Sequence, residues 1–356
     1  MSGFFSSRHS ALRAYTPGEQ PQDMQYIKLN TNESPFTVSE RVKKAAADAA
    51  VRINLYPDPE CSVLKSKIAE MCGVSADNII LTNGSDEILN FIFMAYGDEQ
   101  HPFIFPDITY GFYKVFACLN GIKYDEIPLG SDFTINAEDY CNRESNIIIA
   151  NPNAPTGICM TLDEIKKIAE SNPDNIVTVD EAYVDFGAES AVRLTKGLPN
   201  LIVTQTFSKS RSMAGARLGF AIAPPELIND LNTIRYSTNP YNINSFTMNA
   251  AIAAVDENEY FMENCRKIAQ TREAVKQRLE KMGFILTDSK ANFLFAKHDA
   301  VSGIELYSEL KKRGVLVRHF ETERICEYNR ITVGTDEQMD RFCEITEQIL
   351  RERGAI

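Results

Sequence analysis

The sequence predicts an α/β fold: a large domain with a mostly parallel, mixed sheet of seven strands sandwiched by helices, and a smaller α+β domain. Short strands that are apolar on both faces alternate with helical patterns from about residue 62 to 235. This alternation is typical of parallel sheets that are covered on both sides. After about residue 240 the pattern changes to a long charged helix and a few short strands, which indicates the second domain.

The large domain is expected to span residues 46–240. Its strands, in order, are NIILT, PFIFP, GIKYDEIP, SNIIIANP, NIVTVDEA, LIVTQTF and RLGFAIAP. The helical segment SVLKSKIAEMCG precedes the first strand, and DEILNFIFMAYG follows it. A capping box of Thr161 and Glu164 predicts the start of the helix LDEIKKIAES.

The small domain is expected to span residues 241–356. A long helix is predicted from Glu257 to Met282, and Gly283 can end it. The strands FIL, NFLFAK and VLVRH and a final helix after Thr335 complete this domain. The loop-rich residues 1–45 are expected to form an N-terminal arm that packs against it.

Composition narrows the classes of function. No apolar run approaches the roughly 18 residues of a membrane span, and the N-terminus lacks the apolar core of a secretory signal. The net charge of −12 argues against a nucleic-acid surface. The eight cysteines are scattered and form no CxxC pair, so we expect reduced thiols, no metal site and a cytoplasmic protein without membrane or nucleic-acid partners.

Polar residues follow several of the predicted strands, at the edge where parallel sheets bind ligands. Asp180 ends the strand in NIVTVDEA, and Tyr183 follows three residues later. Lys209 follows the strand in LIVTQTF. The free N–H groups at the start of a helix can bind a phosphate. Gly84, Ser85 and Asp86 lead from the strand NIILT into a helix and are therefore expected to bind one.

One cofactor, pyridoxal 5′-phosphate, explains this set of groups, because it needs an amine for its aldehyde, a carboxylate at its pyridine nitrogen and a clamp for its phosphate. We expect Lys209 to be the amine, Asp180 the partner of the ring nitrogen, and Tyr183 the partner of the ring 3′-oxygen. Thr206, Ser208 and Arg217 are expected to bind the cofactor phosphate. Tyr110 is expected to stack on the cofactor ring.

The order of these motifs resembles that of the fold-type I aminotransferases of the aspartate aminotransferase superfamily, over nearly the whole chain. The motifs follow one another in this order: NGSDE, a tyrosine after a proline-containing strand end, NPNAPTG, VDEAY, SK with an arginine eight residues after the lysine, and RITVGT. Six motifs in the right order are specific, although each alone is weak. Within the superfamily, YTPGEQP, KLNTNESPF, LYPDP, VRHF and NRITVGT most resemble the histidinol-phosphate aminotransferases.

This resemblance implies transamination of L-histidinol phosphate with 2-oxoglutarate, which gives imidazole-acetol phosphate and glutamate in histidine biosynthesis. It implies a homodimer in which Tyr56 reaches the cofactor phosphate of the neighbouring subunit. It also implies that the cationic residues Arg330 and Arg341 bind the substrate and that Tyr15 and Asn32 close over it.

The sequence departs from the family pattern at one position. Many relatives have asparagine immediately before PTG, where it hydrogen-bonds the ring 3′-oxygen, but this chain has Ala154. We expect Asn153, or Asn151 on a differently folded turn, to supply the amide. If neither reaches the ring, Tyr183 is left to hold the oxygen alone.

Other interpretations stay open at this point. An aromatic or broad-specificity aminotransferase would share the machinery, and a threonine-phosphate decarboxylase would share much of the scaffold. The sensor half of a transcription regulator would need a basic DNA-binding domain. Arg330 can instead form a surface ion pair, Arg341 can belong to a solvated helix face, and Tyr15 and Tyr110 can be packing aromatics.

Overall fold

The structure is a computed structural model that describes every residue except 1, 3, 10–11, 13 and 15–17. Its largest sheet has seven strands in the order β2-β8-β7-β6-β5-β3-β4, which confirms the predicted fold class. The sheet is parallel except for β8, which runs antiparallel to both of its neighbours. The strands are β2 Ile79–Thr82, β3 Phe103–Pro106, β4 Tyr124–Ile127, β5 Asn146–Ala150, β6 Val177–Asp180, β7 Leu201–Thr206 and β8 Gly219–Ile222.

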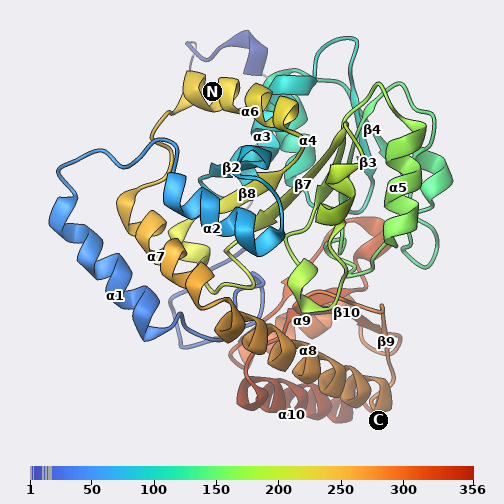
Figure 1. Cartoon of the computed structure of the whole chain (residues 1–356). Helices are drawn as coiled ribbons and strands as arrows, with labels where there is room; N and C mark the ends of the chain where they lie inside the picture. The colour runs from blue at the N-terminus through green and yellow to red at the C-terminus, as the bar shows by residue number, and fades with distance from the viewer. Residues whose placement is uncertain (1, 3, 10–11, 13, 15–17) are drawn as a thin grey trace.

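Helices cover both faces of this sheet (Figure 1). Successive side chains of a strand point to opposite faces, so Ile147 and Ile149 of β5 enter one apolar core, and Ile148 and Ala150 enter the other. The first core is completed by α2 Ser62–Cys72, α5 Leu162–Ser171 and α7 Ser245–Asp256. The second is completed by α3 Ser85–Tyr96, α4 Phe112–Asn120 and α6 Pro225–Thr238.

A four-stranded antiparallel sheet, β12-β13-β10-β9, forms the centre of the C-terminal part. Its strands are β9 Phe284–Leu286, β10 Phe293–His298, β12 Arg318–His319 and β13 Asn329–Thr332. The helices around it are α8 Asn258–Lys281, α9 Gly303–Lys312 and α10 Asp336–Glu352. The segment VLVRH, expected as one strand, is divided, because β11 Val315–Leu316 pairs with β1 Ile27–Lys28 instead.

The N-terminal arm contributes to both parts of the molecule. Beyond the β1–β11 pair, Leu29 lies in the core of the C-terminal part. Helix α1 Glu40–Ala49, in contrast, packs against α7, whose alanines belong to the core of the large sheet. The division at residues 45 and 240 stays a prediction, and this packing favours grouping α1 and α7 with the large sheet.

Three further observations concern membrane helices, cysteines and metal-binding groups. No helix in the described part of the chain is both long and apolar enough to cross a membrane. Each of the eight cysteines carries a free thiol. Among the described residues, no group of three or more histidine, cysteine, aspartate or glutamate side chains is placed to hold a metal ion.

Candidate active site

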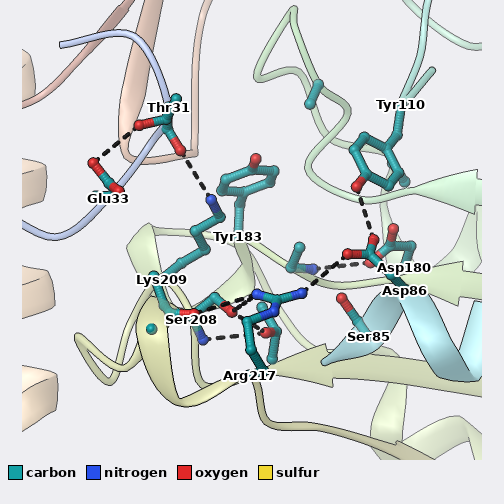
Figure 2. A pocket seen from close by; sticks show the side chains of 16 residues that line it. Thr31, Glu33, Ser85, Asp86, Tyr110, Asp180, Tyr183, Ser208, Lys209 and Arg217 are labelled. Atoms are coloured by element: carbon teal, nitrogen blue, oxygen red, sulfur yellow. Dashed lines mark hydrogen bonds and ion pairs between the residues drawn. The ribbon is translucent and has the colours of Figure 1, made fainter. Parts of the chain in front are cut away.

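The predicted polar residues meet in a cavity of about 350 Å³ at the carboxyl ends of β5, β6 and β7 (Figure 2). The strand register explains this meeting, because Asp180, the last residue of β6, lies between Ala150 of β5 and Thr204 of β7. The start of α3 forms another wall. The residues that line the cavity include Thr31, Glu33, Ser85, Asp86, Tyr110, Ala150, Ala154, Asp180, Tyr183, Thr206, Ser208, Lys209 and Arg217.

Lys209 enters the cavity from the short connection between β7 and β8. Phe207 is fully buried just before it, and the backbone of Phe207 bonds to Leu218 and Met213, which fixes the base of the connection. The Lys209 Nζ donates a hydrogen bond to the carbonyl oxygen of Thr31 at 3.1 Å. Burial and, next, the charge of Arg330 lower the pKa of this amine to about 8. At neutral pH about a tenth of an amine with this pKa is in the neutral form, which can act as a nucleophile or base.

Asp180 lies at the closed side of the cavity and is only 4% exposed. Its Oδ2 accepts a hydrogen bond from the hydroxyl of Tyr113 at 2.8 Å. Its Oδ1 accepts longer bonds, of 3.3 Å each, from the Ala182 N–H and the Thr204 hydroxyl. Burial raises the pKa of Asp180 to about 6, and the bond from Tyr113 opposes that rise. Asp180 is therefore a buried carboxylate that a cationic ring nitrogen would stabilise.

Tyr183 stands beside Lys209, whose Nζ is 5.9 Å from the centre of the phenol ring. The edge contact with Phe293, with 5.1 Å between ring centres, holds the ring in place. The Tyr183 oxygen accepts a hydrogen bond from Asn32 Nδ2 at 3.0 Å. Because this bond uses the oxygen as acceptor, the phenolic proton is free to be donated to a ligand. Asn32 thus touches Tyr183, which the sequence did not indicate.

One part of the cavity, called the anion cradle below, is formed by the start of α3 with Thr206, Ser208 and Arg217. The first N–H groups of α3 have no partner within their own helix, as at any helix start. Arg217 Nη2 pairs with Asp86 at 3.1 Å, and Nη1 donates to the Ser208 hydroxyl at 3.4 Å. The Thr206 hydroxyl is 3.0 Å from that of Ser208.

Gly84 is required for this arrangement. Its φ of +81° and ψ of 162° fall in a region that is open almost only to glycine. A Cβ at this position would lie 2.6 Å from Arg217 Nη2. The guanidinium can approach the start of α3 only because residue 84 has no side chain.

The amine, the buried carboxylate and the anion cradle fit the three functional parts of pyridoxal phosphate, since the missing side chain at Gly84 lets the Arg217 guanidinium reach the start of α3, where the phosphate would bind. Tyr110 also lines the cavity, and its hydroxyl donates to Asp86 Oδ1 at 2.8 Å. The donor set therefore matches the chemistry that this cofactor requires.

The structure does not bring Asn153 to the cavity, contrary to expectation. Its amide is already bonded, because Nδ2 donates to the Ile108 carbonyl and the Thr156 hydroxyl, and Oδ1 accepts from the Thr109 hydroxyl. Asn151 is likewise bonded to the backbone of Met160. Ala154 is the residue of this turn that lines the cavity.

A second cavity of about 360 Å³ adjoins the first and shares Tyr110, Tyr183 and Lys209 with it. Arg330 and Arg318 line it together, because they are register partners on β13 and β12. Arg330 Nη2 donates to the Asn30 carbonyl at 3.1 Å. The sequence motifs indicated Arg330 and the VRHF segment, but they did not single out Arg318.

Two other expected residues lie outside the two cavities. Arg341 pairs with Glu344 on the exposed face of α10, away from both cavities, because α10 turns its apolar residues inward. Tyr56 is 81% exposed and stacks on Tyr241 with 4.5 Å between ring centres. Tyr15 lies outside the described residues.

Known proteins resemble this chain along nearly its whole length. Residues 24–345 match the family described as aminotransferase class I and II. The chain is 49% identical to the histidinol-phosphate aminotransferase of Brachyspira hyodysenteriae, with 99% of this chain and all of that protein covered. It is 46% identical to the enzyme of the same name from Clostridium acetobutylicum, with coverage of 97% and 98%.

Solved structures agree about the fold. The histidinol-phosphate aminotransferase of Sinorhizobium meliloti, in complex with pyridoxal 5′-phosphate, superposes with a TM-score of 0.89. The two chains are 23% identical, and 99% of each is covered. The family match and the identity of its relatives show that the chain belongs to the class I and II aminotransferases.

Proposed function

We propose that this chain transfers the amino group of L-histidinol phosphate to 2-oxoglutarate with pyridoxal 5′-phosphate as cofactor. The products are imidazole-acetol phosphate and glutamate, and the reaction belongs to histidine biosynthesis. The observation that carries the proposal is the 49% identity, over the full length, to an enzyme named histidinol-phosphate aminotransferase. The cavity around Lys209, Asp180 and Arg217 supports it with the matching chemical groups.

The proposed roles follow from the geometry of the cavity. When bound, the cofactor supplies an electron sink that makes the substrate Cα–H acidic. Lys209 Nζ would hold the cofactor through its aldehyde carbon and would accept the substrate Cα proton as a general base. Its pKa of about 8 suits that task near neutral pH. Asp180 would hold the proton on the pyridine nitrogen, and Tyr183 would donate its phenolic proton to the ring 3′-oxygen.

The phosphate of the cofactor is proposed to bind between the start of α3 and Arg217. Ser85 and Asp86 would supply backbone N–H groups, while Thr206 and Ser208 would supply hydroxyls. Arg217 would exchange part of its contact with Asp86 for charge-assisted bonds to the phosphate. Tyr110, held at Asp86, is proposed to lie against the cofactor ring.

Arg330 and Arg318 are proposed to bind the anionic group of each substrate. L-histidinol phosphate presents a phosphate, whereas 2-oxoglutarate and glutamate present carboxylates. Guanidinium groups bind both kinds of anion with paired hydrogen bonds. Asn32 is proposed to act at Tyr183 rather than only as a cover over the substrate.

We further propose that the active enzyme is a homodimer and that Tyr56 completes the phosphate site of the partner subunit. In the single chain, Tyr56 is largely exposed within a segment that also exposes Val51, Ile53 and Leu55. Apolar exposure of this extent is typical of a surface that associates with another protein. The free thiols are consistent with a reducing, cytoplasmic location. Roles for Tyr15 and Arg341 in substrate binding stay predictions.

A substrate test separates the proposal from its alternatives. The cofactor-loaded protein is mixed with L-histidinol phosphate, L-phenylalanine or L-threonine phosphate, and the absorbance of the cofactor is followed. We expect L-histidinol phosphate to convert the cofactor to its amine form, 2-oxoglutarate to reverse the change, and phenylalanine to react with a much lower kcat/KM. A preference for phenylalanine would make the protein an aromatic aminotransferase, and release of CO₂ from threonine phosphate would make it a decarboxylase.

A further inference from the structure

Tyr113 is a buried residue that the proposed chemistry does not use. It lies in the first turn of α4 and is 0% exposed. It lines neither of the two cavities of the site. Its hydroxyl nevertheless makes the shortest hydrogen bond to Asp180, 2.8 Å to Oδ2. Tyr113 therefore touches the carboxylate from the side of the protein interior.

The phenol ring of Tyr113 is held firmly in that position. It packs against Phe105 of β3, with 5.8 Å between ring centres, and meets Tyr110 edge to face at 5.6 Å. Tyr110 in turn donates to Asp86, so two neighbouring tyrosines of one segment each hold one carboxylate of the site. The two bonds that reach Oδ1 of Asp180 are both longer, at 3.3 Å.

We propose that Tyr113 is a positioning residue that keeps Asp180 ionised and aims its carboxylate at the ring nitrogen of the cofactor. The proposal rests on the proposed function, since it needs the cofactor ring to lie against Asp180. A hydrogen bond donated to a carboxylate favours the charged form. Without the hydroxyl, a deeply buried carboxylate would lose its best donor and would take up a proton at a higher pH.

The electrostatic surroundings of Asp180 support this role. Three titratable groups act on it: Asp86 from the start of α3, Tyr113 from α4 and Tyr183 from its own segment. The negative charge of Asp86 and burial both raise the pKa of Asp180, and Tyr113 is the strongest influence that lowers it. Burial also raises the pKa of Tyr113 well above its usual value, so the phenol stays a neutral donor.

The test compares Tyr113→Phe with Tyr140→Phe in the full-length protein. Tyr140 is an equally buried tyrosine whose hydroxyl has no hydrogen-bond partner among the described residues, so it controls for the loss of a buried hydroxyl. The cofactor is removed, and the Kd for pyridoxal 5′-phosphate is measured from pH 5 to pH 9 by absorbance titration. Circular dichroism and thermal melting confirm that each variant is folded.

In the wild type, affinity for the cofactor should decline as the pH falls through the pKa of Asp180, because the protonated acid cannot pair with a pyridinium. Tyr113→Phe should raise the Kd at pH 7 about tenfold, the usual effect of losing a hydrogen bond to a charged group. It should also move the midpoint of the decline to a higher pH. Tyr140→Phe should match the wild type in both measurements.

A second variant keeps the test decisive if Tyr113→Phe does not fold. Thr204→Val removes the weaker donor to Asp180 and should move the midpoint in the same direction by a smaller amount. Unchanged Kd and midpoint in the folded variants, with normal binding by the wild type, would overturn the role of Tyr113 alone. Absence of cofactor binding by the wild type would instead overturn the proposed function.

Discussion

Gly84→Ala tests whether the anion cradle depends on the missing side chain at residue 84. The new Cβ would lie 2.6 Å from Arg217 Nη2 and 3.2 Å from Cζ. Since the guanidinium is the end of a flexible side chain, it can yield to the new methyl group. The expected consequence is a displaced Arg217 rather than an unfolded protein.

The size of each effect follows from the geometry. The backbone conformation at residue 84, with φ +81° and ψ 162°, costs a non-glycine residue about 1–3 kcal/mol of folding free energy. Loss of the Arg217 contacts to a phosphate removes about 1.5–3 kcal/mol of binding free energy. The Kd for pyridoxal phosphate should therefore rise about ten- to hundredfold.

Two other glycines separate backbone strain from displacement of Arg217. Gly73 has φ +65° with open space around its Cβ position, so Gly73→Ala should lose about 1 kcal/mol of stability and keep full cofactor affinity. Gly197 has an ordinary φ of −117° and equally open space, so Gly197→Ala should change neither quantity. Urea denaturation measures stability, and absorbance titration of the cofactor-free protein measures the Kd. Wild-type cofactor affinity in Gly84→Ala would refute the assignment of the phosphate to this cradle.

Three further results are expected. Lys209→Met should be more stable than the wild type when both lack cofactor, because the pKa of the buried amine is lowered to about 8. Urea denaturation should show that this gain in stability shrinks from pH 8 to pH 10.5. A gain that is independent of pH would contradict the lowered pKa. Arg330→Lys should lower kcat/KM for L-histidinol phosphate at least about tenfold in steady-state assays, since lysine cannot form paired bonds, and should leave the Kd for the cofactor unchanged. Ala154→Asn should add a hydrogen-bond donor to the ring 3′-oxygen. The absorbance of the lysine-bound cofactor changes with pH, and the midpoint of this change should fall by about one pH unit. An unchanged midpoint would show that residue 154 does not face that oxygen.

The sequence was sufficient for the sheet and for the residues at the ends of its strands. Strands that are buried on both faces are recognisable as apolar runs, and the residue after such a run must lie at the edge of the sheet. Asp180 and Lys209 were placed correctly at one edge for this reason. The long helix, expected from Glu257 to Met282, differs from α8 by one residue at each end.

Side-chain direction within turns and on helices was harder to predict. In the NPNAPTG turn, the amide of Asn153 bonds to Ile108 and Thr109 of the segment after β3, while the next residue, Ala154, faces the cavity. Arg341 follows a motif of the family, but the apolar face of α10 turns it to solvent. The turn has no periodic pattern that distinguishes its two directions, whereas the helical spacing of Met339, Phe342 and Cys343 already favours the polar side for Arg341.

Two residues were missed because their partners are distant in the chain. Tyr113 meets Asp180 across 67 positions, and nothing in PDITYGFYK indicates that its hydroxyl points at a carboxylate. Arg318 becomes a neighbour of Arg330 only through the pairing of β12 with β13. A signal for Arg318 was present, since a cation in a short apolar strand requires an anionic partner or ligand.

The bond between Lys209 and the cofactor aldehyde is the central claim. Borohydride reduction of the cofactor-loaded protein, followed by peptide mass spectrometry, tests it most directly. We expect one phosphopyridoxyl adduct, on the peptide that contains Lys209, and no adduct in Lys209→Ala. Trapped cofactor on a different lysine, or bound cofactor that borohydride attaches to no residue, would contradict it.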